Sequence, residues 1–337
     1  MHKYKSVSAF ILIIILSVLG LGCSMAKDSV PRAAQDEPTW NLEMINLGDS
    51  WEITRGDQNI MVAIIGWGVD RDNPYLGGRV AHSWDYVTSS EDISDPTGHD
   101  TFAAGIVLSI APEVSLMALR VMDGEGRDVG RLHSAITYAA DHGADIILLP
   151  IALTEIPQNK YIDQVQGSIL YAYSKNVRFV IGAQGRGVHH GYRFPGYLRG
   201  VYNVSGLDRQ GNFSDQSTAN DLNFIAAPCE EIPGIETRGD WQNIGGTSWS
   251  SSHLAGVAAL MLSANPLLYN DEIEGILIET AQDRGIFGKD IYFGHGIIDS
   301  YQSVKASRDL LFYNLMLETL DYKSHPYKND LNLYLGR

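Results

Sequence analysis

Cysteine and basic residues are both scarce in this chain of 337 residues. Only two cysteines are present, Cys23 and Cys229, so a single chain forms at most one bridge and a disulfide framework is excluded. Lysine and arginine number 25 against 40 acidic residues, which gives a formal net charge of -15. A surface of this sign repels phosphate backbones, so the sequence predicts no nucleic-acid partner.

Long hydrophobic runs are absent except at the start of the chain. Lys3 and Lys5 make that start positive, and the stretch from Val7 to Leu21 is nearly all apolar. A charged start, a short apolar stretch and a small-residue end are typical of a signal peptide, and the run is too short and wrongly flanked for a transmembrane span. We therefore assign residues 1–22 to a signal peptide that exports the protein.

Cys23 follows the small-residue end of that segment, Gly20-Leu21-Gly22. This arrangement is similar to a bacterial lipobox, in which the cysteine is lipidated and becomes the new N-terminus. Gly20 departs from the leucine that usually stands three residues before the cysteine, and an ordinary cleaved signal is the alternative. The sequence predicts a lipoprotein of the bacterial cell envelope, held to the membrane through Cys23, with residues 23–37 as a polar, flexible tether. Acylation of Cys23 would leave Cys229 without a disulfide partner.

Short continuous apolar runs follow the tether. They occupy residues 60–65, 146–149, 177–181, 201–204 and 224–227. Runs of this kind are typical of strands that are buried on both faces of a parallel sheet.

Helical periodicity lies between some of these runs. Apolar residues fall on one helical face over 132–140, before Gly143, and over 162–173. Strands that alternate with helices predict an α/β fold with a doubly wound, mostly parallel sheet flanked by helices. We expect a single domain over residues 38–305 and a C-terminal extension over 306–337, with a docked helix near 310–320.

Three blocks, in this order along the chain, resemble the subtilisin-like serine proteases (the subtilase family). The blocks are Val62-Ala-Ile-Ile-Gly-Trp-Gly-Val-Asp70, Gly98-His-Asp-Thr-Phe-Ala-Ala-Gly105 and Gly246-Thr-Ser-Trp-Ser-Ser-Ser-His-Leu-Ala-Gly256. The family writes them as VAVIDTGVD, GHGTHVAG and GTSMAxPHVAG. Each match alone is weak, but together they cover nearly the whole chain from Trp40 to Ala306, and the resemblance implies a subtilisin-like fold.

The resemblance places a nucleophile and a base, but no acid. Ser248 stands where the family has its nucleophilic serine, and His99 stands where it has the general base. A serine hydroxyl needs a histidine to accept its proton and an acid to orient that histidine. The acid position is Gly66. Asp70 and Asp100 are the nearest candidates, but Asp70 matches another family position, and Asp100 adjoins His99, where helical side chains are expected to point apart.

The oxyanion hole and the substrate cleft also depart from the family pattern. The family donates from an asparagine in a segment that reads Gln184, Gly185 and Arg186 here, and none of these is asparagine. Its glycine-rich cleft strand corresponds to Pro150, Ile151 and Ala152, followed by Leu153. These side chains are expected to narrow the groove.

No cofactor pattern is evident. Family members often bind calcium in loops, and calcium binding here stays open, because the acidic residues Glu91, Asp92 and Asp95 form no specific ligand pattern. His189 and His190 lie in a loop without the spacing of a metal site.

Two functions follow from these departures. With acid, oxyanion donor and open cleft all altered, we expect a catalytically impaired pseudoprotease that binds a protein or peptide partner or serves as a structural subunit. The alternative is an active serine endopeptidase that uses Ser248 and His99 with an acid that the sequence does not reveal.

Overall fold

The computed structural model describes residues 39–319, apart from residue 92 and residues 124–128, 154–156, 184, 186–190, 236 and 238–244. The predicted signal peptide, tether and lipidated Cys23 lie outside the described residues. So do Gln184, Arg186, Asp92 and the His189-His190 pair.

The chain folds around a seven-stranded sheet in the order β2-β3-β1-β4-β5-β6-β7, and the pairings between neighbouring strands are parallel. The strands are β1 (Met61–Gly66), β2 (Val80–Asp85), β3 (Ser115–Arg120), β4 (Ile146–Leu149), β5 (Phe179–Ala183), β6 (Tyr202–Leu207) and β7 (Asn223–Pro228). The predicted parallel α/β fold is confirmed, and all five apolar runs are strands. Two strands were not predicted, β2 and β3. The edge strand β2 shows no continuous apolar run, and most of its side chains are exposed or only partly buried. In β3 only the four central residues are buried.

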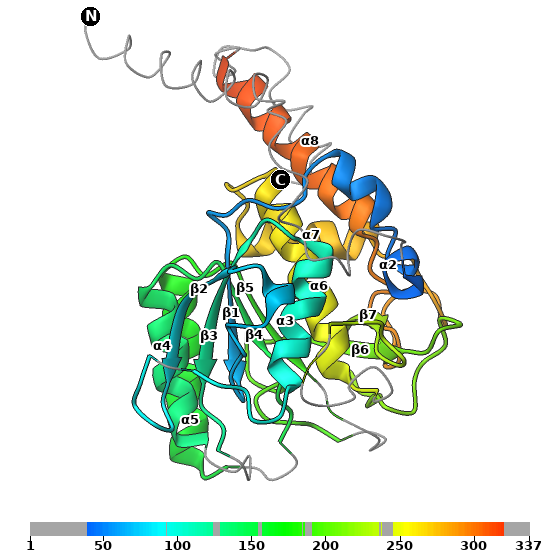
Figure 1. The fold of residues 1–337 in the computed structure, drawn as a ribbon. Helices are drawn as coiled ribbons and strands as arrows, with labels where there is room; N and C mark the ends of the chain where they lie inside the picture. The colour runs from blue at the N-terminus through cyan, green and yellow to red at the C-terminus, as the bar shows by residue number, and fades with distance from the viewer. Residues whose placement is uncertain are drawn as a thin grey trace, which may run out of the picture. The chain divides into compact units, whose positions relative to one another are not determined.

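Helices cover both faces of the sheet (Figure 1). On one face lie α3 (His99–Ile110) and α6 (Thr247–Ala264), and on the other α4 (Leu132–Asp141) and α5 (Asn159–Ser174). The helices predicted over 132–140 and 162–173 are α4 and α5. The remaining α-helices among the described residues are α2 (Trp40–Met44), α7 (Asn270–Thr280) and α8 (Ser300–Thr319).

Residues of β1 divide between the two layers of the core. Val62 and Ile64 pack on the side of α3 and α6, whereas Ala63 and Ile65 pack on the side of α4 and α5. Successive strand residues point to opposite faces, so a strand covered on both sides must be apolar throughout.

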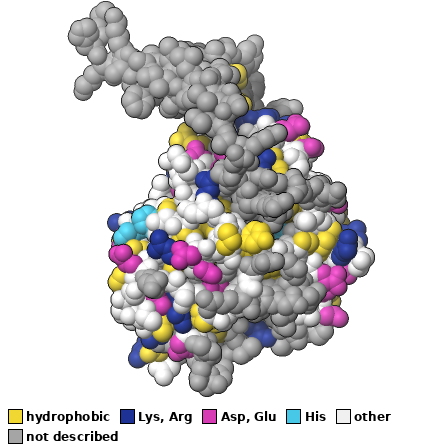
Figure 2. Space-filling view, in the orientation of Figure 1, with side chains coloured by type: hydrophobic (Ala, Val, Ile, Leu, Met, Phe, Trp, Pro, Cys, Tyr) yellow, Lys and Arg dark blue, Asp and Glu magenta, His cyan; other side chains and the backbone are white. Residues whose placement is uncertain are grey.

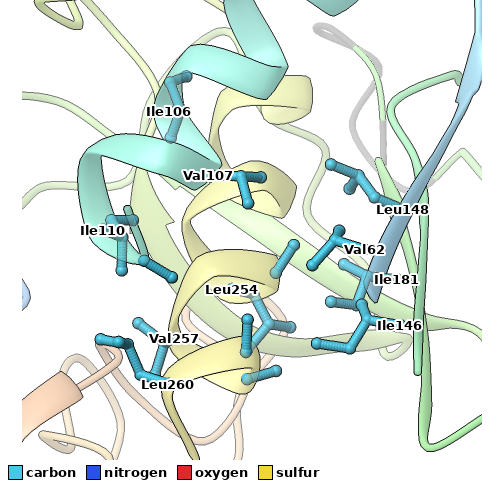
Figure 3. Close-up of a cluster of buried hydrophobic side chains, with 14 of the residues drawn as sticks. Val62, Ile106, Val107, Ile110, Ile146, Leu148, Ile181, Leu254, Val257 and Leu260 are labelled. Carbon is cyan, nitrogen blue, oxygen red and sulfur yellow. The ribbon is translucent and has the colours of Figure 1, made fainter. Parts of the chain in front are cut away.

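Helix α6 is almost entirely buried, which fixes the position of its N-terminus. In Figure 3, its residues Leu254 and Val257 lie between the α3 side chains and the sheet residues Ile146 and Ile181. A helix packed on all sides cannot shift without opening the core, so the residues at its start are held rigidly.

The predicted C-terminal helix belongs to a longer one, since α8 runs from Ser300 to Thr319 without a break at residue 305. It packs on α6 and α7. None of the helices in the described part of the chain has the length and apolar character needed to cross a membrane. On the face shown in Figure 2, acidic and basic side chains are interspersed.

Candidate active site

The starts of two helices meet at the candidate site. His99 is the first residue of α3, and Ser248 is the second residue of α6. Trp249 follows Ser248 and packs on the His99 ring, with 4.8 Å between the ring centroids. On its other side, His99 contacts Trp67, which follows β1, at 5.0 Å. The ring of His99 therefore contacts the residue next to Ser248 and the residue that follows β1.

Asp100 presents a carboxylate to the His99 ring, although this chain has Gly66 at the family's acid position. Its Oδ1 lies 2.7 Å from His99 Nδ1, and its side chain is completely buried. When Asp100 is ionised it can only accept, so Nδ1 of His99 is then the donor of this hydrogen bond and Nε2 is left as an acceptor. The expectation that Asp100 points away from His99 is wrong.

The physical reason lies at the start of α3. His99 follows Gly98, whose φ of 78° lies in the left-handed region, so no helical turn precedes the ring. Helical side chains lean toward the N-terminus, and at the first turn no preceding helical residue occupies that direction. Asp100 Oδ2 is held by the Trp67 backbone N–H at 2.7 Å, which draws the carboxylate toward the end of β1.

Gly66 makes this arrangement fit. A β-carbon added to Gly66 would overlap Asp100 Oδ2, so the Asp100 carboxylate occupies the space where a side chain at position 66 would begin. The two departures from the family pattern, glycine at 66 and aspartate at 100, are therefore coupled. The carboxylate has moved from a strand to a helix while its target, His99, has stayed in place.

Asp95 fixes the start of α3, a role that the sequence did not reveal. Its Oδ2 accepts hydrogen bonds from the Thr101 backbone N–H at 2.9 Å and from the Thr101 hydroxyl at 2.7 Å. Its Oδ1 accepts from the backbone N–H groups of Thr97 and Gly98. These bonds satisfy N–H groups that a helix start leaves without partners. In the sequence, the only sign of this role is an aspartate four residues before His99.

Burial raises the pKa of the Asp100 carboxyl, while the hydrogen bond and charge of His99 act in the opposite direction, and the nearby Asp95 raises it further. A carboxylate removed from water favours a positive partner strongly. When His99 takes up a proton, the buried Asp100 carboxylate gains a positively charged partner. The carboxylate in turn stabilises the His99 imidazolium.

The Ser248 hydroxyl rests against the cleft strand. Its Oγ donates to the Pro150 carbonyl at 3.0 Å. Ile151 is buried and Ala152 is partly exposed. The predicted cleft segment of Pro150, Ile151 and Ala152 therefore begins beside Ser248.

Gly185 is one of two residues, with Arg186, that match the position of the family's oxyanion asparagine. Its backbone N–H donates to Thr247 Oγ1 at 2.7 Å, which fixes it against the residue before Ser248. With no side chain, Gly185 cannot supply the family's carboxamide donor. Gln184 and Arg186 lie outside the described residues, so the structure places one of the three predicted residues of this segment.

No group of three or more His, Cys, Asp or Glu side chains able to hold a metal occurs within the described ranges. Among the acidic residues considered for calcium, Asp95 uses both carboxylate oxygens to hold the start of α3.

Similar proteins share this arrangement of elements. Thermitase of Thermoactinomyces vulgaris is 29% identical over 274 residues, which cover 78% of this chain and 94% of thermitase. A thermophilic serine proteinase of Bacillus sp. (strain AK1) is 30% identical over 268 residues, covering 76% of this chain and 64% of that protein. Two more distant relatives carry names that describe them as extracellular proteases.

A solved structure of MycP1 without its N-terminal propeptide matches the fold with a TM-score of 0.70 at 23% identity, covering 80% of this chain and 97% of that one. The model of the subtilase family (peptidase family S8) matches residues 57–296, which include His99, Asp100 and Ser248. These matches agree with the parallel sheet and its flanking helices. The chain therefore belongs to the subtilase family.

Proposed function

We propose that this protein is a serine endopeptidase whose catalytic acid is Asp100. The observation that carries the proposal is the 2.7 Å contact between Asp100 Oδ1 and His99 Nδ1. The expectation of inactivity rested mainly on the missing acid, and that premise does not hold. The family supplies the chemistry, since its members hydrolyse peptide bonds through a serine nucleophile.

In the proposed mechanism, His99 Nε2 accepts the proton of the Ser248 hydroxyl as Oγ attacks the peptide carbonyl carbon. Asp100 keeps the proton of Nδ1 in place and stabilises the imidazolium that forms. His99 then gives its proton to the leaving amine, and water hydrolyses the acyl-enzyme by the reverse sequence. Before attack, the Ser248 hydroxyl must rotate away from the Pro150 carbonyl, from which it is 3.0 Å at rest.

The oxyanion that develops is stabilised by the start of α6. Ser248 lies in the first turn of an 18-residue helix, where backbone N–H groups lack helical partners and the helix dipole favours negative charge. The asparagine side chain that assists in the family is absent, because the position that matches it is Gly185 or Arg186. Loss of one such donor costs roughly 10²–10³-fold in turnover. We therefore expect a slow protease rather than a dead one.

An alkyl fluorophosphonate tests the proposal without a known substrate, because it reacts with an activated serine alone. The full chain is expected to be labelled stoichiometrically, Ser248→Ala not at all, and Asp100→Asn far more slowly. Absence of labelling in a folded preparation would show that Ser248 is not activated.

A pseudoprotease that binds a partner is the second candidate. The observations that favour it are the missing side-chain donor at Gly185 and the engagement of the Ser248 hydroxyl by Pro150. In that case the cleft would bind a peptide without cleaving it. The same labelling experiment separates the two, since a pseudoprotease leaves the probe unreacted.

We also propose that the protein is exported and anchored to the bacterial cell envelope through a lipid on Cys23. The charged start, the apolar stretch and the cysteine after Gly22 support this proposal. Two relatives named as extracellular proteases support export. Protein substrates or partners would then be met outside the cytoplasm.

A further inference from the structure

A short loop between α7 and α8 presents two apolar side chains to solvent. The loop spans residues 283–290. At its tip, Phe287 is 96% exposed and Ile286 is 70% exposed, the highest values among the large hydrophobic residues that the structure describes. Single exposed apolar residues are ordinary on a protein surface, but two adjacent ones at the tip of one turn form a protruding apolar point.

Hydrogen bonds within the loop hold this tip in place. Asp290 Oδ2 accepts from the Ile286 backbone N–H at 3.0 Å, and Asp283 Oδ2 accepts from the Gly288 backbone N–H at 2.9 Å. Gly285 and Gly288, on either side of the tip, have φ angles of 86° and 82°, which glycine adopts without strain. The loop therefore sets its own conformation, and it holds both apolar side chains away from the domain.

The base of the loop is fixed to the domain. Asp290 Oδ1 accepts from the backbone N–H groups of Tyr292 and Phe293, each at 2.8 Å. On the other side of the base, Gln282 and Ile297 exchange two backbone hydrogen bonds of 2.8 and 2.9 Å. A tip that is already ordered loses little conformational entropy when it binds a surface.

Positive side chains flank the apolar tip. Arg284 and Lys289 stand just outside the two glycines, and both are exposed. The formal charges of the loop balance, but of its two acidic residues Asp290 is buried and Asp283 binds the Gly288 N–H. Apolar side chains flanked by cations are typical of segments that bind a bilayer, because the former enter the acyl boundary while the latter meet lipid phosphates.

The base of the loop also lies close to where the predicted tether joins the domain. Asp299 Oδ2 accepts from Gln282 Nε2 at 3.1 Å and from Asn46 Nδ2 at 2.8 Å. Asn46 comes two residues after α2, which is preceded by the predicted tether of residues 23–37. A tether of this length spans at most about 50 Å. A lipid on Cys23 would therefore keep this part of the domain near the bilayer.

We propose that the loop 283–290 inserts Ile286 and Phe287 into the surface of an anionic phospholipid bilayer, with Arg284 and Lys289 against the lipid phosphates. This inference goes beyond the proposed peptidase activity and rests on the proposed lipid anchor at Cys23. The anchor raises the effective concentration of bilayer at the loop, so even a weak contact is occupied. A second contact of this kind also orients a domain that one tether leaves free to turn.

Quenching by phospholipids with brominated acyl chains tests insertion at the tip itself. Phe287→Trp keeps an aromatic ring there, and subtraction of the wild-type emission isolates the added tryptophan. The full chain is reconstituted in vesicles of phosphatidylcholine, with or without phosphatidylglycerol. Leu170→Trp is the matched control, because Leu170 is an apolar residue of α5 that is 52% exposed.

In vesicles that contain phosphatidylglycerol, bromine is expected to lower the emission added by Phe287→Trp at least about twofold, since the ring reaches the acyl boundary. The emission added by Leu170→Trp should not change. Arg284→Gln/Lys289→Gln, introduced together with Phe287→Trp, should reduce the quenching to the level seen in phosphatidylcholine alone.

Equal emission from Phe287→Trp in brominated and plain lipid refutes the inference, and labelling of Cys23 by a palmitate analogue then shows that the anchor itself stands. A blue-shifted emission that bromine does not quench would place the tip against another protein or a second copy, which also refutes it. If Cys23 carries no lipid, Cys23→Ser/Phe287→Trp with vesicles in large excess decides insertion alone, and absence of quenching overturns the inference. Fluorophosphonate labelling of Ser248 tests the peptidase separately.

Discussion

The assignment of Asp100 as the catalytic acid gives the sharpest prediction for this protein. Replacing Asp100 with asparagine removes the charge that stabilises the His99 imidazolium and leaves a side chain of the same shape. In serine proteases, loss of the triad acid lowers turnover by roughly 10⁴-fold, which corresponds to about 5 kcal/mol of transition-state stabilisation. Asp100→Asn is therefore expected to slow fluorophosphonate labelling of Ser248 by about three to four orders of magnitude.

Substitutions at Gly66 test the same assignment from the other side, because Gly66 leaves room for the Asp100 carboxylate. Because a β-carbon on Gly66 would overlap Asp100 Oδ2, Gly66→Ala must displace the carboxylate and disturb its bonds to His99 Nδ1 and to the Trp67 N–H. Gly66→Asp alone would crowd two carboxylates into one buried space, where like charges oppose ionisation. Both single variants are expected to lose activity.

The double variant Gly66→Asp/Asp100→Gly returns the acid to the strand, where the family carries it. We expect it to label at least about 100-fold faster than Asp100→Gly alone, since the carboxylate regains His99. Thermal unfolding checks that all variants are folded. Full activity in Asp100→Asn, or a double variant no faster than Asp100→Gly, would refute the role of Asp100 as catalytic acid.

The same carboxylate is expected to lower stability at neutral pH. Burial raises the pKa of Asp100, so the stability that its neutral form provides is present at acidic pH and is lost as pH rises through the native-state pKa. Denaturant unfolding of wild type and Asp100→Asn across pH should therefore show the variant gaining relative stability as pH increases. A constant difference would contradict the raised pKa.

Four other predictions follow from the described residues and from the N-terminal sequence. Burial lowers the pKa of His253 to about 4, from 6.5 in the unfolded chain, so about 3 kcal/mol of folding free energy should be lost as pH falls from 6.5 to about 4. In denaturant titrations, His253→Gln should remove this dependence on pH. Burial raises the pKa of the Cys229 thiol to about 12, so iodoacetamide at pH 8 should alkylate it only after denaturation. Phe102 is fully buried against Trp249, and Phe102→Ala should cost about 3–5 kcal/mol in unfolding free energy. Cys23→Ser should move the protein from the membrane to the soluble fraction of cells and abolish labelling by a palmitate analogue, whereas an unchanged membrane fraction would contradict the lipid anchor.

The acid shows what the sequence could not decide. Adjacent helical residues usually point apart, so Asp100 was set aside on a rule that holds within helices but not at their first turn. Only the structure shows that His99 and Asp100 form the first turn of α3 after Gly98, and that the Trp67 N–H binds the Asp100 carboxylate at the end of β1.

By itself, the sequence determined the parallel α/β fold, five of its strands, and the positions of the candidate nucleophile and base. Those features depend on local patterns, namely continuous apolar runs such as 146–149 and short motifs around His99 and Ser248. Tertiary structure alone decided which carboxylate reaches the imidazole, because a hydrogen bond depends on direction and on vacant space. Gly66 has no side chain, and the Asp100 carboxylate fills the space that this leaves. The sequence alone does not show which residue occupies that space.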